Sequence, residues 1–151
     1  MKPLIILITS FCVAAIVLKF ATPQVDFRLA GRIALAIMLS FTAMGHFLFT
    51  EGMAKMLPAK VPFRKQVVYF TGVLEILAAI CLLIPGWEVA TGWALILFFL
   101  ALLPANIYAA MNKISFEKPQ EKGPGVKYLW FRVPLQMLFI AWTYFSAIHR
   151  W

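Results

Sequence analysis

The sequence predicts an all-α membrane protein: a four-helix transmembrane bundle with one additional N-terminal transmembrane helix. Hydrophobic residues make up 63% of the 151 residues and charged residues 13%, against roughly 45–50% and about 25% in soluble domains. The apolar residues fall into five runs, each close to the ~20 residues that cross a bilayer as a helix. Such a composition excludes disordered and disulfide-scaffold proteins, and a soluble enzyme could not bury this much apolar surface.

The first run, about Leu4–Phe20, follows the basic residue Lys2. A basic start and a short apolar core are also typical of a signal peptide, but a small-x-small cleavage motif is poorly placed here. We therefore expect residues 1–22 to form a transmembrane helix that is additional to a four-helix core at residues 28–149. Core and additional helix belong to one membrane domain, residues 1–151.

The other four runs form the expected core. The second and third, about Leu29–Phe49 and Val67–Ile84, carry ionisable residues within apolar sequence. The fourth, about Ala90–Ala110, is interrupted by Pro104, and the fifth covers about Leu129–Ile148. Each is long enough, or nearly so, for a transmembrane helix, which satisfies its backbone hydrogen bonds internally.

The segments between the runs leave no room for a separate soluble domain. Glu51–Leu57 predicts a short amphipathic helix on the membrane surface, and Pro58 limits its length. Asn112–Lys127 is polar and ends in Gly123-Pro124-Gly125, which predicts a loop.

The distribution of lysine and arginine predicts the orientation, because short cytoplasmic loops carry an excess of both. One side would hold nine of them: Lys2, Lys55, Lys60, Arg64, Lys65, Lys113, Lys118, Lys122 and Lys127. The other side would hold three: Lys19, Arg28 and Arg150. We expect a multi-pass protein of a bacterial inner (plasma) membrane, with the N-terminus cytoplasmic and the C-terminus outside. The net charge of +8 favours attachment to anionic lipids over nucleic acid.

Polar residues inside the apolar runs are the candidate ligand-binding residues. They are His46, Glu75, Asn106, Arg132 and Gln136. At about 1.5 Å per residue, all five lie within roughly 12 Å of the cytoplasmic ends of four different helices. A polar side chain in hydrocarbon is costly, so these residues should face the bundle interior and indicate a site.

Two interpretations are open for both Glu75 and His46. A carboxyl alone in lipid would be protonated, whereas beside Arg132 or His46 it could stay charged and accept a proton or bind a ligand. The alternative is a buried pair that only fixes helix register. His46 could donate to a quinone-type carbonyl or carry a proton, or it could simply hydrogen-bond a neighbouring helix.

The remaining candidates are equally open. Asn106 could bind the backbone carbonyl that Pro104 frees on the preceding turn, or it could contact a ligand. Arg132 and Gln136 are four residues apart and could together hold Glu75 or an anionic headgroup. Arg132 could instead extend to the membrane surface.

Small residues share a helical face with the polar residues in several runs. Gly72, Glu75 and Ala79 form one such face, and small residues let membrane helices approach closely. The chain has no nucleophile triad, metal-ligand cluster, phosphate-binding loop or nucleotide fingerprint. Cys12 and Cys81 lie in separate runs without metal-ligand spacing, which favours packing roles.

Four short motifs occur in order along the second to fifth runs: Gly45-His46-Phe47, Thr71–Ile76, Pro104–Tyr108 and Arg132–Gln136. Over about residues 28–145, their order and spacing resemble the DoxX-like family of small bacterial membrane proteins. The resemblance implies a four-helix membrane bundle and an association with quinone or redox systems. The namesake of the family is a subunit associated with thiosulfate:quinone oxidoreductase in archaeal respiration. The resemblance transfers no catalytic residues.

These observations favour an accessory membrane subunit with an intramembrane polar pocket for a quinone-like or other lipophilic ligand. A quinone is thus the only cofactor to which the sequence points, and enzymatic activity is left open. Alternatives are a membrane subunit of an oxidoreductase complex, a small transporter or channel, and a purely structural scaffold. The expected partners are anionic lipids, a redox protein that docks on the basic loops, or a second copy of the chain.

Overall fold

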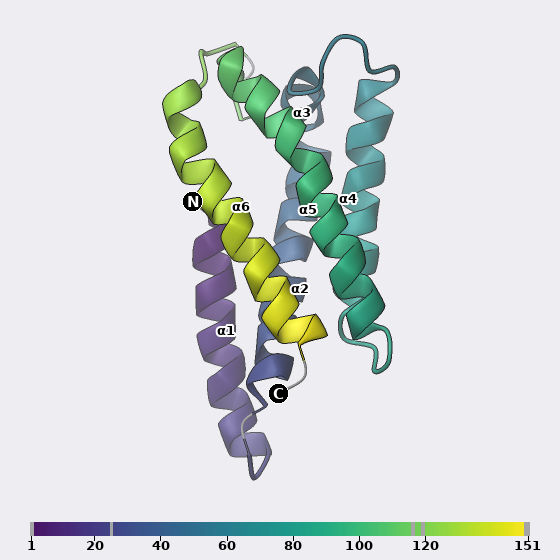
Figure 1. Ribbon diagram of the computed structural model, residues 1–151, viewed down its shortest axis with the longest axis vertical. Coiled ribbons are helices and arrows are strands. Elements are labelled where there is room, and N and C mark those ends of the chain that lie inside the picture. The colour runs from purple at the N-terminus through teal and green to yellow at the C-terminus, as the bar shows by residue number, and fades with distance from the viewer. Residues whose placement is uncertain (1, 25, 116, 119, 150–151) are drawn as a thin grey trace.

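The computed structural model describes residues 2–24, 26–115, 117–118 and 120–149, and this part of the chain is helical without a β-strand. The elements in chain order are α1 (Lys2–Ala21), α2 (Phe27–Leu48), α3 (Thr50–Lys55), α4 (Arg64–Cys81), α5 (Glu88–Met111), the 3-10 turn η1 (Val126–Tyr128), α6 (Leu129–Thr143) and the π-helical turn η2 (Tyr144–Ile148). Figure 1 shows the long helices running side by side.

The helical fold confirms the all-α class predicted from the sequence, and the helices lie within a few residues of the predicted segments. Three of them, α1, α2 and α5, are long and apolar enough to cross a membrane. The remaining two long helices fit a membrane span less well by length and composition. Helix α4 contains Arg64, Lys65 and Glu75 in 18 residues, and α6 has 15 residues before its π-helical turn.

Local chemistry explains where several helices begin and end. The side chain of Asp26 caps α2 by accepting the backbone N–H groups of Arg28 and Leu29, both at 2.9 Å. After α4, the chain turns at Gly86 with a φ of 89°, and before α6 it turns at Gly125 with a φ of 75°. Glycine adopts these left-handed conformations without a steric penalty.

Helix α2 lies at the centre of the packing. It buries eight residues and contacts α1, α3, α4, α6 and η2. Helix α1 packs against α2 but buries only Leu7 and Ala14. In Figure 1, α1 begins below the upper ends of the other long helices and extends furthest at the lower end.

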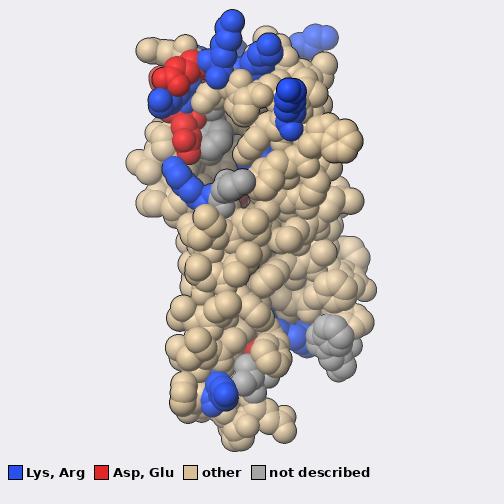
Figure 2. Space-filling view, turned by 90° about the vertical axis from the view of Figure 1, so that its left-hand side faces the viewer, with Lys and Arg blue, Asp and Glu red and all other residues tan. Residues whose placement is uncertain are grey.

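The basic loops meet at the upper end of the molecule, where most of the visible Lys and Arg side chains lie (Figure 2). Lys2 pairs with Glu117 at 3.2 Å, which joins the start of α1 to the loop before α6. Lys65 pairs with Glu51 at 2.9 Å, which joins α4 to α3. Arg150, expected on the opposite side, lies outside the described residues.

Candidate functional site

Glu75 is buried between α2 and α4, with its side chain 4% exposed. Its Oε1 atom lies 3.4 Å from Nε2 of His46, and its Oε2 atom accepts a hydrogen bond from the Thr42 hydroxyl at 2.8 Å. Both carboxylate oxygens therefore have partners from α2. This arrangement brings together two of the residues that the sequence selected.

The second ring nitrogen of His46 also has partners. Its Nδ1 atom lies 3.0 Å from the Thr71 hydroxyl and 3.2 Å from the backbone carbonyl of Val68, and the Thr71 hydroxyl donates to that carbonyl at 2.8 Å. With the hydroxyl proton used in this way, Nδ1 is a donor, and the contact between Nε2 and Glu75 needs one more proton, on the imidazole or on the carboxyl. In the other tautomer, Nδ1 accepts from the Thr71 hydroxyl and the Nε2–H donates to the Glu75 carboxylate. The pair can therefore hold one exchangeable proton.

Helical spacing and one glycine assemble this group. Thr42 and His46 are one turn apart on α2, and Thr71 and Glu75 are one turn apart on α4. A Cβ atom on Gly72 would lie 2.9 Å from the Cβ of His46, so the glycine permits the close approach of the two helices. The sequence interpretation did not select the two threonines as site residues. The sequence signal that could have identified them is their spacing, since each threonine lies four residues before an ionisable residue, His46 or Glu75, on the same helix.

Asn106 and Gln136 form a second polar pair, between α5 and α6. The Asn106 amide Nδ2 donates to the Gln136 side-chain oxygen at 3.2 Å, and Gln136 Nε2 donates to the backbone carbonyl of Phe99. The side chain that reaches the backbone near Pro104 is thus Gln136, not Asn106 as one interpretation of the sequence expected. Both amides are buried.

Arg132 is bonded to neither of these two pairs. It is half-buried and forms no hydrogen bond or ion pair with a described residue. The expectation that Arg132 and Gln136 together hold Glu75 is wrong in this structure, because Glu75 is held from α2 and Gln136 is bonded to α5. No hydrogen bond or ion pair among the described residues joins the His46–Glu75 pair to the Asn106–Gln136 pair.

A third polar contact lies at the other end of α2. Arg32 Nη1 is 3.8 Å from Glu88 Oε1, and Glu88 Oε2 accepts the backbone N–H of Gly86 at 2.6 Å. A carboxylate in the first turn of α5 also interacts favourably with the helix dipole. The Nε atoms of Arg28 and Arg32 are buried without a hydrogen-bond partner among the described residues. The sequence interpretation selected neither Arg32 nor Glu88 as a ligand-binding residue.

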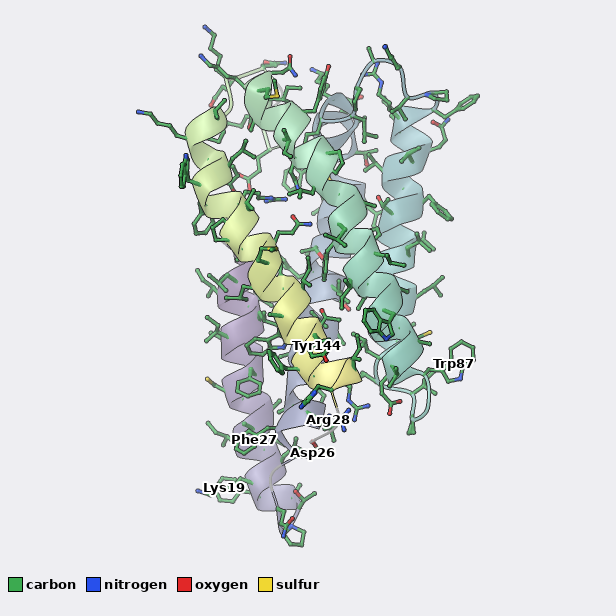
Figure 3. All side chains as sticks on the ribbon, in the orientation of Figure 1. Lys19, Asp26, Phe27, Arg28, Trp87 and Tyr144 are labelled. Atoms are coloured by element: carbon green, nitrogen blue, oxygen red, sulfur yellow. The ribbon has the colours of Figure 1, made fainter. Side chains whose placement is uncertain are left out.

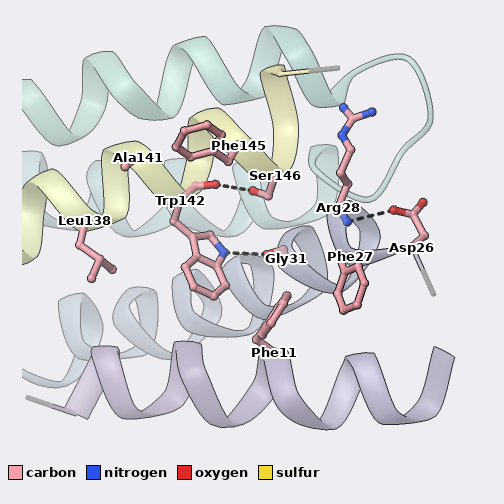
Figure 4. A pocket seen from close by; sticks show the side chains of 10 residues that line it. All are labelled: Phe11, Asp26, Phe27, Arg28, Gly31, Leu138, Ala141, Trp142, Phe145 and Ser146. Atoms are coloured by element: carbon pink, nitrogen blue, oxygen red, sulfur yellow. Dashed lines mark hydrogen bonds between the residues drawn. The ribbon is translucent and has the colours of Figure 1, made fainter. Parts of the chain in front are cut away.

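A pocket of about 640 Å³ opens near the same end, between α1, α2 and α6 (Figure 4). Its lining residues are Phe11, Asp26, Phe27, Arg28, Gly31, Leu138, Ala141, Trp142, Phe145 and Ser146. The Trp142 indole N–H donates to the carbonyl of Gly31 at 3.2 Å, and its ring meets that of Phe11 edge-on at 5.1 Å. None of the five candidate ligand-binding residues lines this pocket. Its residues come from separate runs and share no sequence pattern.

A second pocket, of about 400 Å³, lies between the two basic loops at the upper end. Its lining includes four basic residues, Lys55, Arg64, Lys113 and Lys122. Its one acidic residue, Glu121, pairs with Lys118 at 3.0 Å. The local charge therefore favours an anion.

A family model described as Domain of unknown function (DUF8561) matches residues 35–147. The chain belongs to this family. No curated protein and no solved structure matches the chain. The DUF8561 region begins within α2, ends within η2, and contains both polar pairs. Helix α1 and the first turns of α2 precede it.

The chemistry available in the DUF8561 region is that of proton transfer and hydrogen bonding. The His46–Glu75 pair can hold an exchangeable proton, and the Asn106–Gln136 pair supplies amide donors and acceptors. The described residues contain no group of three or more His, Cys, Asp or Glu side chains that could hold a metal ion. Cys12 and Cys81 are free thiols.

Proposed function

We propose that this DUF8561 protein is a polytopic membrane protein of DoxX-like type. Helices α2, α4, α5 and α6 with η2 form a four-helix transmembrane core at residues 28–149, and α1 is a fifth transmembrane helix. The resemblance in motifs supports this, because the motif residues lie on those four helices. The exposed apolar side chains support it as well: Phe70 on α4, Leu97 on α5 and Met137 on α6 are each more than 60% exposed.

The proposed location is a bacterial inner membrane, with the N-terminus cytoplasmic and the C-terminus outside. The gathering of the basic loops at one end supports this orientation (Figure 2). The basic pocket between those loops supports the attachment of the cytoplasmic face to anionic lipids.

Within this membrane protein, the proposed function is that of an accessory subunit that holds a quinone-like lipophilic molecule. The observation that carries the proposal is the buried His46–Glu75 pair, which can hold an exchangeable proton. An ionisable pair inside a membrane bundle is costly, and such residues usually mark a site. A quinone carbonyl needs a hydrogen-bond donor, which protonated His46 or protonated Glu75 provides.

The proposal includes Asn106, Gln136 and Arg132 because the sequence puts them at a depth similar to that of His46 and Glu75. Asn106 and Gln136 would offer amide groups from α5 and α6, and Arg132 would offer a cation. In this structure the two pairs satisfy their own polar atoms. A ligand would therefore bind by exchanging for one partner, most directly for the 3.4 Å contact between His46 and Glu75.

A structural scaffold is the second candidate, and the same hydrogen bonds favour it. Glu75 is satisfied by His46 and Thr42, and Gln136 is satisfied by Asn106 and the Phe99 carbonyl. Interhelical hydrogen bonds of this kind fix helix register without any ligand.

Replacement of Glu75 by glutamine separates the two candidates. Glutamine keeps an oxygen for the Thr42 hydroxyl and an N–H for His46, so the fold should persist while the exchangeable proton is lost. We expect a short-chain quinone to bind the purified variant at least tenfold more weakly, by calorimetry in detergent, with little change in Tm. The matched control is Glu51→Gln, which removes an exposed carboxyl from α3. Equal quinone binding by both variants, or none by the native protein, would favour the scaffold.

A further inference from the structure

The groove between α1, α2 and α6 has walls that suit a hydrocarbon chain. Four aromatic rings line it, from Phe11, Phe27, Trp142 and Phe145, together with the aliphatic side chain of Leu138. Figure 4 shows the rings of Phe11 and Trp142 in the space between α1 and α6, with Phe27 near the start of α2. From Ser146 to Leu138 the groove follows about 12 Å of helix. Its volume of about 640 Å³ lies within the roughly 300–1,000 Å³ of ligand pockets.

One end of the groove is cationic. Arg28 lines it, and its Nε atom is buried with no hydrogen-bond partner in the part of the chain that the structure describes. Asp26 also lies there, but it accepts the N–H groups of Arg28 and Leu29 as the cap of α2 and forms no ion pair with the Arg28 guanidinium. Arg28 therefore forms no ion pair with a described residue, and an anionic ligand group can supply one.

The position of Arg28 in the bundle points to the membrane surface. In Figure 3, Arg28 lies at the same end as Trp87 and Tyr144, and Lys19 lies beyond it. Trp and Tyr are enriched where hydrocarbon meets headgroups, and lysine extends towards the headgroups from helix ends. The cationic end of the groove is thus at headgroup level, and the aromatic walls lead from it into the apolar layer.

We propose that the groove binds one acyl chain of an anionic phospholipid, with the phosphate held by Arg28. A guanidinium binds phosphate through paired, charge-assisted hydrogen bonds. The bound lipid would join α1 to the core, to which α1 contributes only two buried residues, Leu7 and Ala14. This site is independent of the proposed quinone site, since Gly31 in the groove and His46 are about 22 Å apart along α2.

Filling the groove tests its occupancy. Ala141 is an exposed lining residue, and Ala101 on α5 is also exposed but lies outside the groove. The chain would be purified from nanodiscs of equal phosphatidylglycerol and phosphatidylcholine, and retained lipid would be counted by native mass spectrometry. We expect about one phosphatidylglycerol per native chain, at least a tenfold loss in Ala141→Trp, and native retention in Ala101→Trp. Equal retention by the two tryptophan variants would overturn the proposal.

Removing the cation tests the headgroup. Arg28→Gln should abolish the preference for phosphatidylglycerol over phosphatidylcholine, whereas Lys19→Gln, which removes a cation outside the groove at the same end, should preserve it. Retention of both lipids in equal amounts by the native chain would overturn the assignment of the phosphate to Arg28. A quinone or another uncharged lipophile in place of the phospholipid would overturn the proposed occupant.

Discussion

Gly72 is where one methyl group should most disturb the candidate site. It lies on α4, three residues before Glu75, and faces α2. In Gly72→Ala, the new Cβ would lie 2.9 Å from the Cβ of His46 and 3.3 Å from Cζ of Phe47. Non-bonded carbon atoms prefer about 3.5–4.0 Å. The two helices must therefore separate by roughly 0.5–1 Å, which also weakens the 3.4 Å contact between His46 and Glu75.

The magnitude follows from two opposing effects. Alanine favours a helix over glycine by about 1 kcal/mol, whereas overpacking of a close contact costs about 1–3 kcal/mol. Gly45 on α2 provides the control, because its added Cβ would meet only the flexible end of Met53, at 3.7 Å. Gly45→Ala thus keeps the gain in helix propensity without the overlap. We expect Gly72→Ala to be less stable than Gly45→Ala by about 1–3 kcal/mol.

Thermal unfolding in a mild detergent, followed by circular dichroism, measures this difference. For a chain of this length, 1 kcal/mol corresponds to about 2–4 °C in Tm, so the two variants should differ by several degrees. A Tm for Gly72→Ala equal to or above that of Gly45→Ala would refute the close approach of α2 and α4 at His46.

Three further predictions concern other parts of the chain. In a double-mutant cycle with Asn106→Leu and Gln136→Leu, thermal unfolding should give a coupling of about 0.6 kcal/mol, at most about 1.7; additive effects would contradict the hydrogen bond between them. The Lys65 ammonium lowers the pKa of Glu51 from its usual 4.5 through a hydrogen bond and charge attraction. Their pair therefore stabilises the fold at neutral pH, and this stabilisation is lost as the pH falls through the lowered pKa. The difference in Tm between the native chain and Glu51→Gln should vanish in acid, and a difference that persists would contradict the pair. Reporter fusions should show a cytoplasmic N-terminus and an external C-terminus, and the reverse result would overturn the proposed orientation.

The sequence was sufficient to predict the helices, because apolar runs of this length have few alternatives in a membrane. It also identified Gly72, Glu75 and Ala79 as one face of α4, and all three are buried. Helical periodicity within one segment fixes such faces locally. The positions of the predicted ligand-binding residues along their helices thus followed from the chain alone.

The partners of those residues did not follow from the sequence. Which polar side chain meets which depends on how neighbouring helices rotate and shift, and periodicity within one helix does not determine either. Glu75 therefore pairs with His46 and Thr42 on α2, where the sequence left Arg132 as an equal option. The groove was missed for a related reason, because Phe11, Trp142 and Arg28 come together only through the packing of three helices.

The two buried polar pairs differ in a way that bears on function. The Asn106–Gln136 pair is neutral, so it can fix the register of α5 and α6 at low cost and has no proton to release. A scaffold needs nothing more than pairs of this type. The His46–Glu75 pair performs the same packing role between α2 and α4 with groups that are more expensive to bury, since apolar replacements of buried ion pairs are often as stable or more so. A neutral pair is sufficient for register, so the proposed site for a proton or ligand offers a reason for an imidazole and a carboxyl at this position that the scaffold does not.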